Sequence, residues 1–330
     1  MGTKMNKRFK TFLLAAALSV TASFSFAAEK VTYLFPAPDF LPAFAPFHLA
    51  KHKGYFDEAG LDVKFQLGKG GADVAKQVAV GNADMGGGIG DTAIIVRANG
   101  LDIRGVALLG GRGLTQIAWR KDSGIKNISD MKGKNIGVID FQDTAYYNLL
   151  AVFASENMSR SDANIQAVGS GGLVQLMISG DLVGMVGVPE WLASIKDAGV
   201  ELETISVDSV FPAMAQAIIA SGKTINERPE VVKGVVNAVL RAIDDIEKDP
   251  AQAAKDYVVA VPRHAGSEDK IEAIMRSYVE LVYPKAENRP RGAFDPEQLK
   301  KVQDFYLENE IVRTAVPIED TYTNQFVTSE

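Results

Sequence analysis

The chain has 330 residues, no cysteine, and a formal net charge of −6 from 35 Lys and Arg against 41 Asp and Glu. Without cysteine there is no disulfide framework and no thiolate metal site, so the fold must rest on its hydrophobic core. An acidic surface of mixed charge argues against nucleic acid and anionic lipid as main partners.

The N-terminal segment, residues 1–27, has the features of a secretory signal peptide. A basic start is followed by a short apolar run at 11–20 and by a small-x-small cleavage pattern at 25–27, Ser-Phe-Ala. The alternative is a membrane anchor, which needs about 20 apolar residues, more than this run provides. We therefore expect a cleaved signal and an exported protein of roughly 300 residues, enough for one large or two medium domains.

From residue 31 onward, short apolar strands alternate with amphipathic segments of helical length. Residues 61–67 alternate apolar and polar side chains, and the following helix places Val74 and Val78 on one face before stopping at Gly81. This alternation is typical of a doubly wound, parallel α/β sheet. We expect strands at 31–35, 61–67, 83–86, 103–109, 115–120, 134–139, 165–168, 184–188 and 203–207, and helices at 46–53, 72–80, 92–99 and 143–158.

The alternation runs through two similar cycles. Residues 78–86 and 176–185 both lead from a helix through a glycine and a short polar turn into a strand. After residue 219 the pattern changes to long helices, which indicates a helical C-terminal region packed on one lobe. The expected C-terminal helices are 229–248, 251–259, 268–282 and 296–309.

The stretch "ADMGGGIGDTA" (83–93) fits the loose dinucleotide fingerprint G-x-G-x-x-[GA]. That fingerprint expects an acidic residue about 20 positions after its glycine, and Leu108 stands there instead. We therefore expect a binding loop and no cofactor.

The sequence contains no complete catalytic motif: S-x-x-K occurs at Ser123 and Ser129, but its partner motifs S-D-N and K-T-G do not. His48 and His52 are one helical turn apart, but no glutamate base stands between them, so a solvated helix face is the expected arrangement. His264 is the third histidine, and no nucleophile is paired with a base. We expect neither a metal site nor an enzyme.

At "HKGYFDEAGLDVKF" (52–65) the sequence begins to resemble a known family. It is similar to the solute-binding proteins of ABC importers, in the branch that serves nitrate, sulfonates, taurine and thiamine-pyrimidine precursors. Further matching elements are the turn at 81–84, "ISDMKGKNIGV" at 128–138, "GSGG" at 169–172 and Pro-Glu-Trp at 189–191. One departure is Val183, where the family usually has Asp.

The resemblance implies a type II periplasmic-binding-protein fold, with two α/β lobes joined by two crossing strands. Lobe one would hold 28–117 and 218–330, and lobe two would hold 118–217. A small-molecule solute would bind in the cleft, and closure of the lobes would be read by the importer permease. We expect a monomer. Two alternatives are an enzyme of the same fold, like the pyrimidine-precursor synthases, and a sensory receptor.

Four loops are expected at the cleft because they follow strand ends and precede helix N-termini, where backbone N–H groups favour polar ligands. They are 36–46, 83–93, 140–146 and 189–191. For each, packing or simple helix capping is the alternative, and Arg112 is either a ligand contact or an ordinary surface arginine. The expected ligand contacts are Phe40, Phe44, Gly88, Asp91, Thr92, Arg112, Gln142, Thr144, Ala145, Glu190 and Trp191.

The expected cleft combines carboxylates with aromatic rings. Asp91, Asp143 and Glu190 would repel a small inorganic anion, whereas aromatic side chains suit an organic ligand. We therefore predict an aromatic or sulfonated acid, or a neutral heterocycle, in preference to nitrate or bicarbonate.

Overall fold

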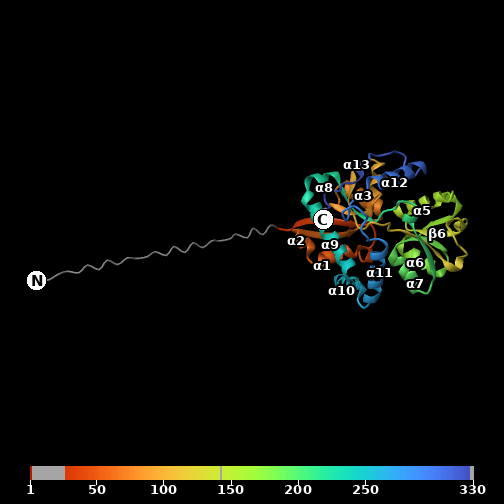
Figure 1. Cartoon of the computed structure of the whole chain (residues 1–330), viewed down its shortest axis with the longest axis horizontal. Helices are drawn as coiled ribbons and strands as arrows, with labels where there is room; N and C mark the ends of the chain where they lie inside the picture. Colours follow the sequence, from red (N-terminus) through yellow and green to blue (C-terminus); the bar gives the residue numbers. More distant parts are fainter. Residues whose placement is uncertain (2–26, 142, 328–330) are drawn as a thin grey trace.

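The computed structural model describes residue 1, residues 27–141 and residues 143–327. Gln142 and almost all of the predicted signal peptide therefore lie outside the described residues. The chain forms two lobes, each built on a five-stranded sheet (Figure 1). The strand orders are β2-β1-β3-β10-β4 in the first lobe and β7-β6-β8-β5-β9 in the second.

Each sheet combines parallel strands with one antiparallel strand. In the first sheet β10 is antiparallel to β3 and β4, and in the second β5 is antiparallel to β8 and β9. The parallel arrangement that the alternation predicts therefore does not extend to these two strands, which enter directly from the other sheet without a helical crossover. The strands are β1 (Glu29–Phe35), β2 (Leu61–Leu67), β3 (Met85–Ile89), β4 (Ile103–Leu108), β5 (Gln116–Arg120), β6 (Asn135–Val138), β7 (Asn164–Ala167), β8 (Gly184–Gly187), β9 (Leu202–Ser206) and β10 (Gln216–Ser221).

Helices cover the sheets of both lobes, and the C-terminal helices return to the first lobe (Figure 1). The first lobe has α1 (Ala45–His52), α2 (Tyr55–Glu58), α3 (Gly71–Ala79), α4 (Thr92–Arg97), α8 (Gly222–Glu227), α9 (Pro229–Lys248), α10 (Pro250–Ala260), α11 (Glu268–Leu281), α12 (Pro296–Glu308) and α13 (Ile318–Thr321). The second has α5 (Thr144–Ser155), α6 (Gly169–Ser179) and α7 (Pro189–Asp197).

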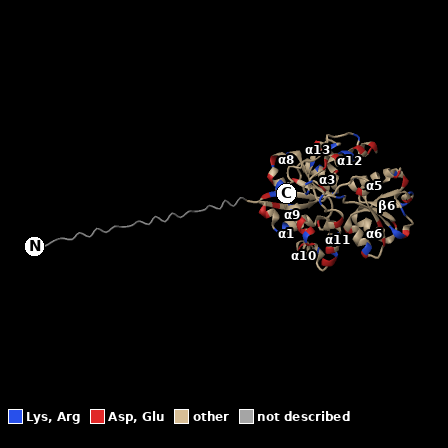
Figure 2. Ribbon diagram, in the orientation of Figure 1, with Lys and Arg blue, Asp and Glu red and all other residues tan. Residues whose placement is uncertain are grey.

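The predicted apolar stripe of α9 faces the core. Val232, Val235, Val239 and Ile243 are all fully buried, as expected for side chains three or four residues apart on one helix face. Within the described part of the chain, no helix combines the length and the apolar character needed to cross a bilayer. Acidic and basic residues are interspersed along the helices of both lobes (Figure 2).

The glycine-rich corner differs from its prediction. Strand β3 runs to Ile89 instead of ending at residue 86, because Gly87 and Gly88 pair with Ile218 and Ala217 of β10. Gly86 has no room for a side chain, since a Cβ there would overlap Val74 of α3. The longer strand brings Gly88 and Ile89 to the space between the lobes.

Candidate functional site

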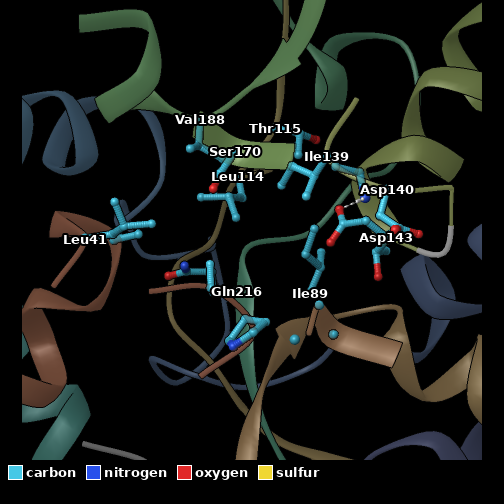
Figure 3. Close-up of a pocket in the computed structure, with 18 of the residues that line it drawn as sticks. Leu41, Ile89, Leu114, Thr115, Ile139, Asp140, Asp143, Ser170, Val188 and Gln216 are labelled. Atoms are coloured by element: carbon cyan, nitrogen blue, oxygen red, sulfur yellow. Dashed lines mark hydrogen bonds between the residues drawn. The ribbon is translucent and has the colours of Figure 1, made fainter. Parts of the chain in front are cut away.

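A cavity of about 370 Å³ lies between the two lobes. It is lined from both sheets, mainly by apolar side chains, and its volume is in the range of small-molecule sites. In Figure 3, Asp140 and Asp143 lie together at one end, and Gln216 lies between Leu41 and Ile89. The apolar lining includes Pro36, Leu41, Phe44, Ile89, Leu114, Ile139, Val186, Val188 and Trp191.

The start of α5 forms one wall of the cavity. The carboxylate of Asp143 accepts the backbone N–H of Ala145 at 2.9 Å (Figure 3), so the alternative that Asp143 caps its own helix is confirmed. That N–H, which we expected to donate to a ligand, is used by the cap. Burial raises the pKa of Asp143 to about 6. Thr144 lines the cavity, and its hydroxyl lies 3.3 Å from the hydroxyl of Thr92 in the other lobe.

The start of α4 lies beneath the opposite wall. Gly88 lines the cavity, and a Cβ there would overlap the side chain of Thr92. Asp91 is fully buried and accepts the Tyr306 hydroxyl of α12 at 2.6 Å. Desolvation by this burial raises the pKa of Asp91 to about 7. Asp91 and Thr92 are not among the residues that line the cavity.

The start of α7 supplies a buried carboxylate and an aromatic wall. Glu190 is 3% exposed and lines the cavity. The Tyr278 hydroxyl of α11 donates to its Oε2 at 2.5 Å, whereas its Oε1 receives no hydrogen bond from the described residues. Burial raises the pKa of Glu190 to about 7. Trp191, 8% exposed, provides an apolar surface beside it.

The predicted contacts therefore separate into two groups. The ring of Phe40 lies 4.0 Å from the Arg263 guanidinium, away from the cavity lining. Arg112 is half exposed, 3.7 Å from Asp208. The predicted residues that line the cavity are Phe44, Gly88, Thr144, Ala145, Glu190 and Trp191; those placed elsewhere are Phe40, Asp91, Thr92 and Arg112; and Gln142 lies outside the described residues.

Several lining residues were not predicted from the sequence. The loop of residues 68–71, Gly-Lys-Gly-Gly, follows β2 and begins α3, so the same strand-end argument would have found it. Gln216 is the first residue of β10, and no loop pattern marks it. Ser170, in the first turn of α6, also lines the cavity, as does Asp140, which belongs to the predicted loop 140–146.

The histidines are placed differently from the expectation. His48 is half-buried, its ring packs against Phe35 and Phe65, and its Nε2 lies 2.9 Å from the Asp39 carbonyl oxygen. A solvated face is therefore wrong for His48, because the aromatic core of the first lobe reaches it, and burial lowers its pKa. Among the residues that the structure describes, no cluster of three or more histidine or carboxylate side chains could hold a metal ion.

Two curated relatives resemble the chain along most of its length. The riboflavin-binding protein RibY of Chloroflexus aurantiacus is 22% identical over 292 residues, covering 86% of this chain and 82% of the relative. A 4-amino-5-hydroxymethyl-2-methylpyrimidine phosphate synthase of Aspergillus parasiticus is 28% identical over 234 residues, covering 67% and 68% of the two chains.

The solved structures that resemble the chain include periplasmic binding proteins. The alkanesulfonate-binding protein SsuA of Xanthomonas axonopodis pv. citri, bound to MOPS, matches with a TM-score of 0.70 and 17% identity, covering 90% of this chain and 98% of that one. The likeness confirms the predicted two-lobed periplasmic-binding-protein fold. The NMT1/THI5-like family model matches residues 41–253, well over half of the chain. The chain therefore belongs to the NMT1/THI5-like family, as its resemblance to this branch of solute-binding proteins predicts.

Proposed function

We propose that the chain is an exported receptor that captures a small organic solute and delivers it to an ABC importer. The observation that supports this best is the cavity of about 370 Å³ between the lobes, to which both sheets contribute lining residues. A ligand there would be surrounded by both lobes, so its binding energy can favour their closure. The predicted signal peptide at residues 1–27 supports export to the periplasm.

Contacts across the cleft fit a hinged receptor. Thr92 meets Thr144, Tyr278 donates to Glu190, and Lys270 of α11 forms an ion pair with Asp197 of α7 at 2.9 Å. We propose that the two lobes move as units, one formed by residues 28–117 together with 218–330 and the other by residues 118–217. The boundaries between them lie inside the crossing strands β5 and β10. Opening would break these contacts, so the ligand must supply the additional stabilisation of the closed form.

The ligand is proposed to be organic. The apolar lining and Trp191 suit a ring or chain. The half-buried carboxylate of Asp143 and the buried carboxylate of Glu190 disfavour a small inorganic anion. Two similar proteins, one named for riboflavin and one for alkanesulfonate, are consistent with an organic solute.

Mass spectrometry of molecules retained by the purified mature protein, followed by calorimetric titration, tests the proposal. We expect one organic compound at about one per chain, and a decrease in radius of gyration by X-ray scattering when it binds. Thermal stabilisation by nitrate or bicarbonate, with none from organic compounds, would overturn the ligand class. Catalytic turnover of the bound compound would overturn the receptor function.

The second candidate function is that of a synthase. It is favoured by the relatives that are named pyrimidine phosphate synthases. The product in that name is a phosphate ester, which carries negative charge. Lys69 is the only Lys or Arg among the described lining residues, and it is exposed, so the cavity offers little to balance a phosphate. If mass spectrometry detects the pyrimidine phosphate being formed by the purified protein, the synthase is favoured instead.

A further inference from the structure

Gln216 presents an acceptor to the cavity in a fixed orientation. Its Nε2 donates to the Ser206 hydroxyl at 3.2 Å, and that hydroxyl donates to Asp208. Because the only hydroxyl proton of Ser206 is directed at Asp208, Ser206 can only accept from Gln216, and the amide cannot be reversed. The Oε1 atom of Gln216 is buried, lies on a lining residue, and has no hydrogen-bond partner among the described residues (Figure 3).

Glu190 presents a second acceptor, from the other lobe. Tyr278 holds its Oε2, and Oε1 is buried without a partner among the residues described. The titratable groups that face this carboxylate from α10, α11 and the segment after α11 are Tyr257, Tyr278 and Tyr283. Burial raises the pKa of all three phenols, so they are uncharged at neutral pH. None of these three neighbours, all within the described part of the chain, supplies a positive charge to the carboxylate.

We propose that the cavity selects an uncharged organic molecule with at least two N–H or O–H donors, which Glu190 and Gln216 accept, and that it rejects carboxylates and sulfonates. The inference rests on the proposed receptor function and narrows its ligand class. Tyr278 and Ser206 are the positioning residues, because each fixes which oxygen faces the ligand.

The physical basis is the cost of a buried acceptor without a donor, about 1–3 kcal/mol for each group. A donor on the ligand removes that cost at Glu190 and at Gln216. A carboxylate or sulfonate instead places acceptor against acceptor, and its charge is repelled by Glu190 and by Asp140 and Asp143, which line the same cavity.

Matched pairs of probes test the charge and donor preference. Benzenesulfonamide and benzenesulfonate have nearly the same size, as do nicotinamide and nicotinate, and each pair exchanges an N–H donor for a negative charge. We expect the amide member to bind the wild-type protein at least about tenfold more tightly in calorimetric titration at pH 8, the loss expected for one unsatisfied hydrogen bond. The same ranking is expected in a thermal-shift screen of a wider set of amides and acids.

Glu190→Gln is the informative variant. The Tyr278 hydroxyl can donate to the new amide oxygen, which leaves the NH₂ group facing the cavity as a donor. The preference for amides over acids should fall at least about tenfold or reverse. Glu203→Gln, at an exposed position on β9, is the matched control and should keep the wild-type ratio. Gln216→Met removes the second acceptor and should weaken the amides while leaving the acids nearly unchanged.

The possible outcomes distinguish a failure of the donor preference from a failure of the receptor function. Tighter binding of the acids by the wild-type protein, or an unchanged ratio in Glu190→Gln, would overturn the donor inference and leave the receptor function intact. If the probe pairs fail but the wider screen yields a ligand, an uncharged donor-bearing compound supports the inference and an anion overturns it. If no organic compound in the screen binds, the receptor function itself fails.

Discussion

Asp91 provides the sharpest test of the electrostatics, because it is buried beside the cavity without lining it. Its carboxyl has one partner, Tyr306, and its Oδ1 has none among the described residues. The folded-state pKa is about 7, against 3.8 for an ordinary Asp. The folded protein therefore keeps a proton at Asp91 that the unfolded chain releases, so stability falls as pH rises through this window. Asp91→Asn should remove that part of the pH dependence.

The expected size follows from linkage at 1.36 kcal/mol per pKa unit. Between pH 5 and pH 8 a shift from 3.8 to about 7 changes the free energy of unfolding by about 2.5 kcal/mol. The comparison between two pH values cancels any constant cost of placing an amide beside Tyr306. Glu190 titrates in both proteins, so its contribution cancels in the comparison.

Urea unfolding of the ligand-free mature protein at pH 5 and pH 8 measures the effect. The wild type should lose about 2.5 kcal/mol more than Asp91→Asn over this interval. Asp62→Asn, on the exposed face of β2, is the control and should follow the wild type. Equal pH dependence in Asp91→Asn and the wild type would refute the reasoning.

Three further predictions concern the cavity and its supports. Binding of benzenesulfonamide should weaken by up to about 30-fold from pH 8 to pH 5.5, because protonation of Glu190 removes the charged acceptor; Glu190→Gln should show no such slope in titrations at the two pH values. Thr144→Val removes the hydroxyl contact with Thr92 and should increase the radius of gyration of the ligand-free protein in X-ray scattering; an unchanged radius would mean that this contact does not favour closure. Gly110→Ala should lower the free energy of unfolding in urea by about 2 kcal/mol or more, because the new Cβ would overlap the Val282 carbonyl oxygen. Gly100 has open space around it but a positive φ, so Gly100→Ala should lower the free energy of unfolding by only about 1 kcal/mol.

Local patterning was sufficient to predict most elements from the sequence. The alternation at 61–67 matches β2, and the apolar stripe with Pro229 and Pro250 as boundaries matches α9. The corner at 83–93 was predicted less well, because a run of glycines resembles a loop. Whether such a run is a strand depends on its partner β10, which lies more than 120 residues later and supplies the pairing.

The site was predicted where it follows helix starts and missed where it depends on long-range packing. Thr144, Glu190 and Trp191 stand at the first positions of their helices, so local sequence indicated them. Gln216 owes its orientation to Ser206 and Asp208, and the free oxygen of Glu190 is defined by Tyr278, 88 residues away. No periodicity in the sequence links such partners.

The two tyrosines that hold buried carboxylates both lie in the C-terminal helices. Tyr278 on α11 orients Glu190, and Tyr306 on α12 binds Asp91. Both stand beyond residue 253, where the family match ends. Ligand preference can therefore be altered from outside the cavity wall, because neither tyrosine lines the cavity, yet each holds a carboxylate at or beside it. Substitutions in α11 and α12 are accordingly a route to altered specificity.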